Sequence, residues 1–274
     1  MPDHDLAWFE MEPYEPFLCE DESDSIFHIE LVKELPDPGK KQRLMVDCSG
    51  KDQPRIELYG LADGWLFDMA PTMEAPVRAR MIANKDCTKA KVRILGSMRF
   101  SLHSAMMLMY ALSTVQKDTL LMHASVTIND GKGYLFLGKS GTGKSTHSQL
   151  WIKYIEGSSL LNDDNPILRV MPNGEVRVFG SPWSGKTACY RNLDVPVGAI
   201  VNLQQAKANK IRRLSIVEAY AALYTSYSGL KFIQRMANGL HTANEKVITT
   251  VPCYLLECLP NAAAARLCHK TVTG

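Results

Sequence analysis

The feature that most constrains the fold is the segment Gly138–Ser145, GKSGTGKS, which fits the spacing G-x-x-x-x-G-K-[ST] in full. Such a loop connects a strand to a helix, and its glycines let the backbone bend around phosphate oxygens. An apolar stretch, 134–137, precedes it, and residues 143–155 follow with helical spacing. The sequence therefore predicts an α/β fold with a P-loop that binds ATP or GTP together with Mg²⁺.

The motif also assigns roles to individual residues. Lys144 would reach the β- and γ-phosphates, and the Ser145 hydroxyl would ligate Mg²⁺. The start of the following helix would add a positive field at the phosphates. The predicted nucleotide-binding residues are Gly138, Lys139, Ser140, Gly141, Thr142, Gly143, Lys144, Ser145 and Thr146.

Two adjacent acids, Asp163 and Asp164, follow the short apolar strand predicted over 159–161. One predicted helix separates them from the P-loop, so the chain can return them to the phosphates. Carboxylates there can hold Mg²⁺ or accept a proton from an attacking hydroxyl. We predict Asp163 and Asp164 as catalytic and metal-binding residues, and the sequence does not say which of them is the base.

Two further segments have both a functional and a structural interpretation. His123 lies near the start of a predicted strand, and a lone histidine is more often a structural residue. The segment 180–186, GSPWSGK, predicts a loop. In it, Lys186 could contact an anionic substrate, or the loop could be a tight turn with Trp183 packed inside.

The chain divides into three parts by pattern. We predict an acidic, poorly structured lead over 1–24, a β-rich N-terminal region over 25–97, and a P-loop α/β domain over 98–274. Residues 1–30 carry ten acidic side chains and no Lys or Arg, which leaves 31 basic against 19 acidic residues in the remainder. A basic body suits a polyanionic ligand, although a dispersed solvated surface explains most of these charges more simply.

Periodicity and turn residues place the elements. In the N-terminal region the predicted strands are 26–33, 42–48, 55–59, 65–69, 77–82 and 89–95. In the P-loop domain the predicted helices are 98–115, 143–155, 216–227, 230–240 and 261–268. Its predicted strands are 120–128, 133–137, 159–161, 197–203 and 251–256, with a hairpin over 166–179.

Several classes of protein are disfavoured by what the sequence lacks. Its seven cysteines form no C-x-x-C pair, which disfavours a zinc site or a redox dithiol. No apolar run is long enough to span a bilayer, and the first residues do not resemble a secretory signal. Basic and aromatic residues do not alternate as in nucleic-acid-binding segments. We therefore expect a cytoplasmic protein with no membrane or nucleic-acid partner.

The stretch HASVTINDGKGYLFLGKSGTGKST, followed by LLNDDNP, resembles the catalytic domain of HPr kinase/phosphorylase, which has the phosphoenolpyruvate carboxykinase type of P-loop fold. The resemblance covers about residues 98–260. It implies that Lys144 and Ser145 occupy the phosphate and metal positions, and that Asp163 and Asp164 supply the base and a metal-side acid. It also implies that His123 is the family's histidine near the phosphates, and that the protein forms a homo-oligomer.

The sequence departs from that family in two places. It lacks the glycine-containing loop that follows the acid pair in HPr kinases, and its N-terminal region does not match their first domain. The resemblance therefore does not specify HPr as the acceptor. No clear set of arginines and metal ligands for oxaloacetate is present, which disfavours carboxykinase activity.

These observations lead to a first hypothesis and two alternatives. The first is ATP-dependent phosphoryl transfer to a serine-like hydroxyl of a protein, peptide or small molecule. In it, Asp163 or Asp164 accepts the hydroxyl proton while His123 and Lys144 offset charge. One alternative is a nucleotide-binding regulatory protein with little or no catalysis. The other is a phosphorylase that runs in reverse with phosphate.

Overall fold

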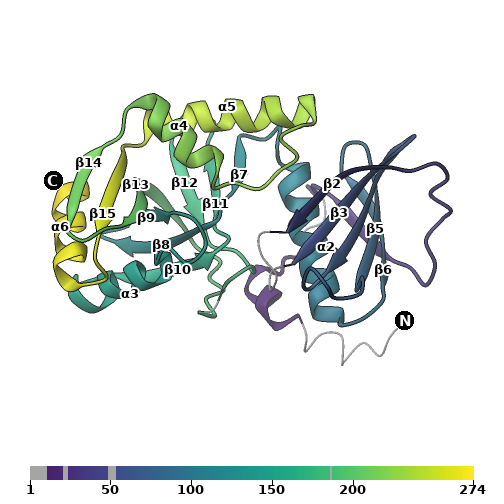
Figure 1. Ribbon diagram of the computed structural model, residues 1–274, viewed down its shortest axis with the longest axis horizontal. Coiled ribbons are helices and arrows are strands. Elements are labelled where there is room, and N and C mark those ends of the chain that lie inside the picture. The colour runs from purple at the N-terminus through teal and green to yellow at the C-terminus, as the bar shows by residue number, and fades with distance from the viewer. Residues whose placement is uncertain (1–10, 21–23, 49–53, 186) are drawn as a thin grey trace. The chain divides into compact units, whose positions relative to one another are not determined.

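The computed structural model describes residues 11–20, 24–48, 54–185 and 187–274. Contacts divide the chain into two compact units, with the boundary between Thr114 and Val115, and Pro16–Leu18 are grouped with the second unit (Figure 1). The sequence suggested a boundary at 97/98. The boundary lies later because the helix α2, Met98–Ser113, packs against two strands of the first unit. The fold is mixed α/β with two sheets.

The first unit is built on a six-stranded sheet. Its order is β1-β6-β5-β4-β3-β2, antiparallel throughout except that β1 pairs with β6 in parallel. The strands lie within two residues of the predicted ones: β1 (His28–Leu31), β2 (Gln42–Cys48), β3 (Arg55–Leu61), β4 (Gly64–Ala70), β5 (Ala79–Asn84) and β6 (Lys89–Ile94). This unit is therefore built mainly of strands and the helix α2.

One face of this sheet forms the core of the unit. Leu58, Phe67, Met81 and Val92 lie opposite one another across four strands and are fully buried. Because side chains alternate between the two faces of a strand, this row points to a single side. The helix α2, which contacts β5 and β6, begins at the capping residue Ser97.

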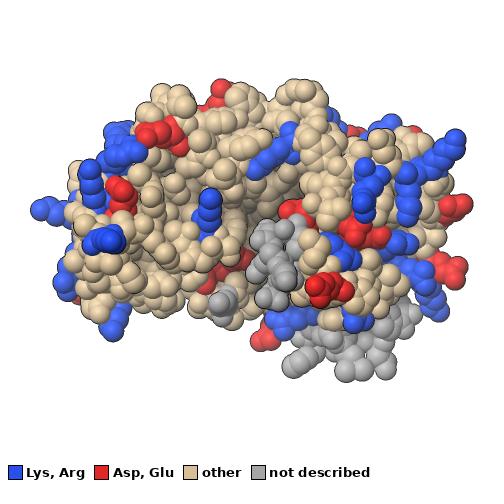
Figure 2. Space-filling view, in the orientation of Figure 1, with Lys and Arg blue, Asp and Glu red and all other residues tan. Residues whose placement is uncertain are grey.

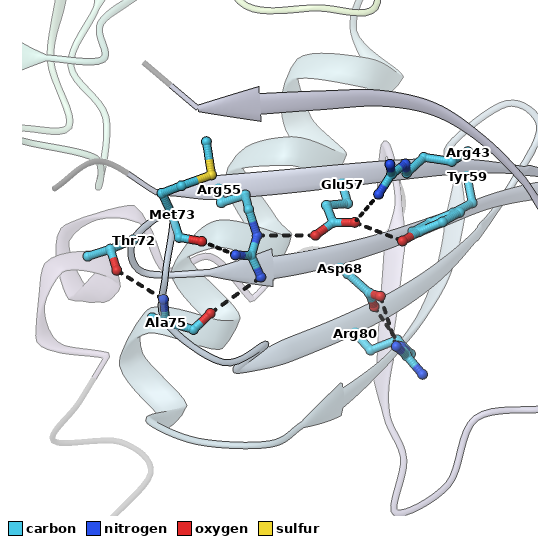
Figure 3. Close-up of polar contacts among 9 residues, drawn as sticks. All are labelled: Arg43, Arg55, Glu57, Tyr59, Asp68, Thr72, Met73, Ala75 and Arg80. Carbon is cyan, nitrogen blue, oxygen red and sulfur yellow. Dashed lines mark hydrogen bonds and ion pairs between the residues drawn. The ribbon is translucent and has the colours of Figure 1, made fainter. Parts of the chain in front are cut away.

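The other face of the same sheet carries a cluster of polar contacts (Figure 3). The buried Asp68 accepts two hydrogen bonds from Arg80, at 2.6 and 2.8 Å. Beside them, Glu57 accepts from the Tyr59 hydroxyl at 2.8 Å and pairs with Arg55 at 3.2 Å. The Asp68 hydrogen bond is the largest cause of the raised pKa of Arg80, which favours the charged guanidinium.

Part of the acidic lead has regular structure, in contrast to the prediction for 1–24. Glu12–Phe17 forms a 3₁₀ helix, η1, in which Tyr14 is buried. The Tyr14 ring meets the edge of the His103 ring at 6.2 Å. Burial of the Tyr14 ring holds this acidic segment in an ordered conformation, although its charges by themselves favour exposure to solvent.

The second unit is built on a nine-stranded sheet, with the order β10-β8-β9-β13-β12-β11-β7 and with β15 joining β13 to β14. The strands are β7 (Thr119–Leu121), β8 (Ala124–Asn129), β9 (Lys132–Leu137), β10 (Ser159–Asp164), β11 (Ile167–Val170), β12 (Val176–Phe179), β13 (Asp194–Gln205), β14 (Lys210–Arg213) and β15 (Cys253–Cys258). The helices are α3 (Lys144–Tyr154), α4 (Ile216–Tyr224), α5 (Gln234–Thr250) and α6 (Ala262–Thr273).

The long strand β13 organises this sheet. Its first residues pair with β12, and the remainder pairs in parallel with β9 on one side and β15 on the other. Alternate residues of these strands pack against α3 and α6, which contact each other. The buried cluster consists of Tyr134, Phe136, Trp151, Ala199, Val201, Leu203, Leu256, Ala265 and Cys268. The P-loop follows β9, so it lies at the end of a strand supported on both sides.

Two predicted elements of the second unit were wrong in extent or number, and one strand was missed. The single strand predicted over 120–128 is two strands, because Met122 bridges to Tyr227 and the chain changes partner there. The helix predicted over 230–240 runs over 234–250, and its buried face continues through the small and polar residues Ala243 and Asn244. The strand β14 was not predicted.

Candidate phosphate-binding site

The loop Gly138–Gly143 connects β9 to α3, as the motif requires. Gly138, Gly141 and Gly143 have φ of 148°, 79° and 106°, in the region that favours glycine. A side chain at Gly138 would approach the Leu203 carbonyl oxygen and Thr142 to 3.2 Å. Within the loop, the Thr142 N–H donates to the Lys139 carbonyl at 3.1 Å. The sequence thus fixes a tight bend whose exposed face is formed by Lys139, Ser140 and Gly141.

The start of α3 has no side-chain cap. Its N-cap residue is Gly143, whereas α2, α4 and α6 are capped by Ser97, Ser215 and Asn261. The first N–H groups of a helix have no partner within the helix, and their positive end attracts anions. Ser145 and Thr146 are exposed on this first turn. The turn therefore leaves backbone donors and two hydroxyls available to an anionic ligand.

Lys144 is the buried cation of the site, with 8% of its surface exposed. Its Nζ donates to the Gly138 carbonyl at 3.1 Å and lies 3.1 Å from His123 Nε2. Burial lowers the pKa of Lys144, while Asp164 and Asp163 oppose that change by favouring the ammonium. Negative phosphate oxygens would compensate such a desolvated ammonium.

His123 lies in the break between β7 and β8, where its backbone N–H donates to the Ser226 carbonyl at 2.6 Å. Its Nε2 is 3.1 Å from Lys144 Nζ and 3.2 Å from Asp164 Oδ1. A single ring nitrogen therefore lies between an ammonium and a carboxylate. A neutral imidazole nitrogen either accepts from Lys144 or donates to Asp164, so the partner of His123 depends on where the ammonium lies.

The two acids have different surroundings at the end of β10. Asp163 is 2% exposed, and its Oδ2 has no hydrogen-bond partner among the described residues. Burying a carboxylate oxygen without a hydrogen-bond partner costs free energy. A bound ligand at this oxygen would remove that cost. The Asp164 side chain is 40% exposed, with Oδ1 facing His123 and Oδ2 accepting from Asn165 Nδ2 at 2.8 Å. The buried Asp163 carboxylate could therefore bind a cation, whereas the partly exposed Asp164 carboxylate is accessible to a ligand from solvent.

Asp164 also has a strained backbone. Its φ is 138°, a conformation that side chains other than glycine rarely adopt. Such a residue costs about 1–3 kcal/mol and persists where its surroundings hold it. An isolated β-bridge to Ser184 and a hydrogen bond from the Gly185 N–H to the Asp163 carbonyl fix the backbone there.

The structure brings some of the predicted site residues together. His123, Lys144 and Asp164 form a continuous chain of contacts, with Asp163 next to it. No hydrogen bond or ion pair between described residues joins Ser145 to either acid. Among the residues in the structure, no group of three or more His, Cys, Asp or Glu side chains has metal-binding geometry. Mg²⁺ commonly uses only one or two carboxylates plus substrate phosphates, and the unpartnered Asp163 Oδ2 is an oxygen of that kind.

Buried contacts hold α3 against the sheet. Ser125 and Ser148 share a buried hydrogen bond of 2.6 Å, and Trp151 Nε1 donates to His147 Nε2 at 3.2 Å. The Phe136 ring packs against the His147 ring at 4.7 Å. Burial lowers the pKa of His147 from 6.5 to about 4, because the charged imidazole would be desolvated.

The lowered pKa of His147 predicts acid sensitivity of this unit. Above pH 6.5 the imidazole is neutral in both the folded and the unfolded chain, and the folded state has its full stability. As the pH falls from 6.5 toward about 4, the unfolded chain binds a proton at His147 and the folded chain does not, so the free energy of unfolding decreases. The loss amounts to about 3 kcal/mol at most. In chemical denaturation at pH 7.5 and pH 4.5, His147→Gln should therefore lose less stability on acidification than the unchanged protein. Equal losses would contradict this assignment.

Four residues of the site's surroundings were not predicted. Gln205, at the end of β13, donates to the P-loop carbonyls of Gly141 and Thr142 at 3.2 and 3.4 Å. Asn162, Asn165 and Ser181 form a polar network beside the acid pair. Their residue types are common in loops, and the one available signal was that Asn162 and Asn165 flank the two acids.

The loop 180–186 agrees with the structural interpretation as far as it is described. Trp183 is buried, with 4% of its surface exposed. Lys186 lies outside the described residues. On the face shown in Figure 2, basic side chains are dispersed among acidic ones over each unit. Of the helices that the structure describes, none is long and apolar enough to cross a bilayer.

Comparison with known proteins shows similarity to a solved structure and to a family model. The HPr(Ser) kinase/phosphatase from Coxiella burnetii is similar in structure, with a TM-score of 0.34 and 16% sequence identity, over 57% of this chain and 88% of that chain. No curated protein matches the sequence. Residues 85–261 match the family model described as SynChlorMet cassette protein ScmC. Since that segment is more than half of the chain, the protein belongs to the ScmC family.

Proposed function

We propose that this protein binds ATP·Mg²⁺ at Gly138–Thr146 and transfers the γ-phosphoryl group to a hydroxyl of a separate acceptor. The observation that carries this proposal is the buried Lys144 ammonium, in contact with His123 and next to two carboxylates at an uncapped helix start. A buried cation, free backbone donors and acids at one place are the parts that phosphoryl transfer requires. The resemblance to the HPr kinase/phosphorylase catalytic domain supports the same reading.

Each residue has a role that its surroundings suggest. Lys144 leaves the Gly138 carbonyl and binds the phosphates, which frees His123 Nε2 to donate to Asp164. Asp164, half-exposed, accepts the proton of the acceptor hydroxyl. The acceptor oxygen forms the new bond to the γ-phosphorus as the bond between that phosphorus and ADP breaks. Asp163 and Ser145 would hold Mg²⁺, which when bound neutralises charge on the phosphates. Asp164 is therefore the proposed base and Asp163 the proposed metal-side acid.

Two measurements test the proposal. Isothermal calorimetry of the full chain with ATP or GTP and Mg²⁺ measures binding, and release of ADP in the presence of serine-bearing proteins, peptides and small molecules measures transfer. The proposal expects binding of ATP and a phosphorylated acceptor. Absence of nucleotide binding would exclude both the kinase and the regulatory alternative. Tight binding without ADP release on any acceptor, water included, would favour the regulatory alternative.

The lowered pKa of Lys144 predicts how nucleotide binding depends on pH. The ammonium of the free protein deprotonates at lower pH than an ordinary lysine, whose pKa is about 10.4. Bound phosphates favour the ammonium, so the pKa rises in the complex and affinity falls between the two pKa values. Calorimetry from pH 7.5 to 10 should show affinity falling and proton uptake on binding. Lys144→Met should bind weakly with no such pH dependence, and an unchanged profile in that variant would contradict the assignment.

A further inference from the structure

The acid pair is bracketed by two asparagines that the proposed mechanism does not use. Asn162 precedes Asp163 and is fully buried, and Asn165 follows Asp164. Asn162 Oδ1 accepts from the Asn165 backbone N–H at 3.0 Å. The two residues therefore close a turn around both carboxylates, and the strained Asp164 lies inside that turn.

Ser181 locks this turn to the facing loop. Asn162 Nδ2 donates to Ser181 Oγ at 3.1 Å and to the Trp183 carbonyl at 3.2 Å. The Ser181 hydroxyl in turn donates to the Asn165 carbonyl at 2.6 Å. The Asn165 N–H and C=O are thus both held by buried side chains. A fully satisfied buried network of this kind specifies one backbone conformation.

The Asn165 side chain then fixes the Asp164 carboxylate itself. Its Nδ2 donates to Asp164 Oδ2 at 2.8 Å, while the other oxygen, Oδ1, lies 3.2 Å from His123 Nε2. With one oxygen held by an amide, the second is aimed at the histidine and at the Lys144 ammonium beyond it. Loss of the amide would let the half-exposed carboxylate rotate into solvent.

We infer that Asn162 and Asn165 are positioning residues for the acid pair: Asn162 holds the backbone turn, and Asn165 aims the Asp164 carboxylate at His123. This inference rests on the proposed function. Residues that orient reacting groups typically contribute 10–100-fold to activity at metal sites, and a small displacement of a reacting group lowers the rate strongly. Each asparagine donates hydrogen bonds through its amide nitrogen. An aspartate has the same shape but no such donor, so it cannot replace either asparagine in the network.

A purely structural role predicts a different outcome, and Asn129 provides the matched control. Asn129 is also a buried asparagine, at the opposite end of β8. Its Nδ2 donates to the Glu156 carbonyl at 2.9 Å and to Ser158 Oγ at 3.2 Å. Asn129→Ala should lower the melting temperature but leave the rate per folded molecule unchanged.

The test uses the full chain with Asn165→Ala, Asn165→Asp, Asn162→Asp and Asn129→Ala. For both Asn165 variants we expect at least a 10-fold fall in ADP release from ATP·Mg²⁺ with water as acceptor. Their Kd for ATP should stay within twofold. Asn162→Asp should show the same fall together with a lower melting temperature. In a crystal structure of Asn165→Ala, Asp164 Oδ1 should lie beyond 4 Å from His123 Nε2.

The inference is overturned if Asn165→Ala keeps its rate within twofold, if Asn129→Ala loses as much activity per folded molecule, or if the carboxylate stays in contact with His123. Failure of the unchanged protein to bind ATP would instead defeat the proposed function. The crystal structure of Asn165→Ala would then decide the positioning inference by itself.

Discussion

Lys144→Met should reduce phosphoryl transfer by about 10²–10³-fold or more, the effect of removing one preorganised charge from a transition state. The Lys144 ammonium is buried and contacts His123, so its loss removes the site's central positive charge. Methionine keeps most of the buried volume, which limits the structural damage. The rate of ADP release under saturating ATP and Mg²⁺ measures the effect.

Lys139→Met is the control for this variant. Lys139 lies in the same loop but is exposed, and we expect its removal to change the rate less than tenfold. A Lys144→Met protein that folds and retains the activity of the unchanged protein would refute the assignment of the phosphate site. Equal losses in both variants would point to the loop's overall charge rather than to one positioned ammonium.

The second large effect should separate the two acids. Asp164→Asn removes the proposed base and should lower the rate by about 10²–10⁴-fold, with little change in the Kd for ATP. Asp163→Asn keeps the shape but removes the charge of the buried side chain, whose Oδ2 has no hydrogen-bond partner among the described residues. It should mainly raise the Mg²⁺ concentration needed for half-maximal activity. Magnesium titrations of ADP release in both variants measure the two effects.

Asp130→Asn serves as the control, since Asp130 is exposed in the turn at the far end of β8. It should leave both the rate and the magnesium requirement unchanged. If Asp163→Asn and Asp164→Asn exchange their expected effects, the assignment of base and metal-side acid is reversed. If neither variant affects the rate, the acid pair has no part in the chemistry.

Local sequence signals predicted the bend at Gly138–Ser145 and its two flanking elements well. Gly138–Ser145 specifies a bend between a strand and a helix by backbone conformation alone, and β9 and α3 lie where expected. The six strands of the first unit follow from alternation and turn residues for the same reason. The roles of the site residues themselves stay predictions until nucleotide binding is measured.

Contacts between distant parts of the chain were beyond local reasoning. The break at His123 depends on the carbonyl of Ser226, about a hundred residues later, so the pattern 120–128 reads as one strand. The extent of α5 was missed because Gly239, Ala243 and Asn244 are buried without being strongly apolar. Asn162 can be buried because Ser181 and Trp183 accept its amide hydrogens. An asparagine in the sequence does not by itself indicate that such distant acceptors exist.

The order of the strands affects when the candidate site forms during folding. The strand β8 pairs with both β9 and β10, so the contacts among His123, Lys144 and the acid pair fall within residues 123–164. Contacts close in sequence form with little loss of chain entropy and favour rapid assembly. This stretch can therefore form early during folding, before β13 inserts beside β9.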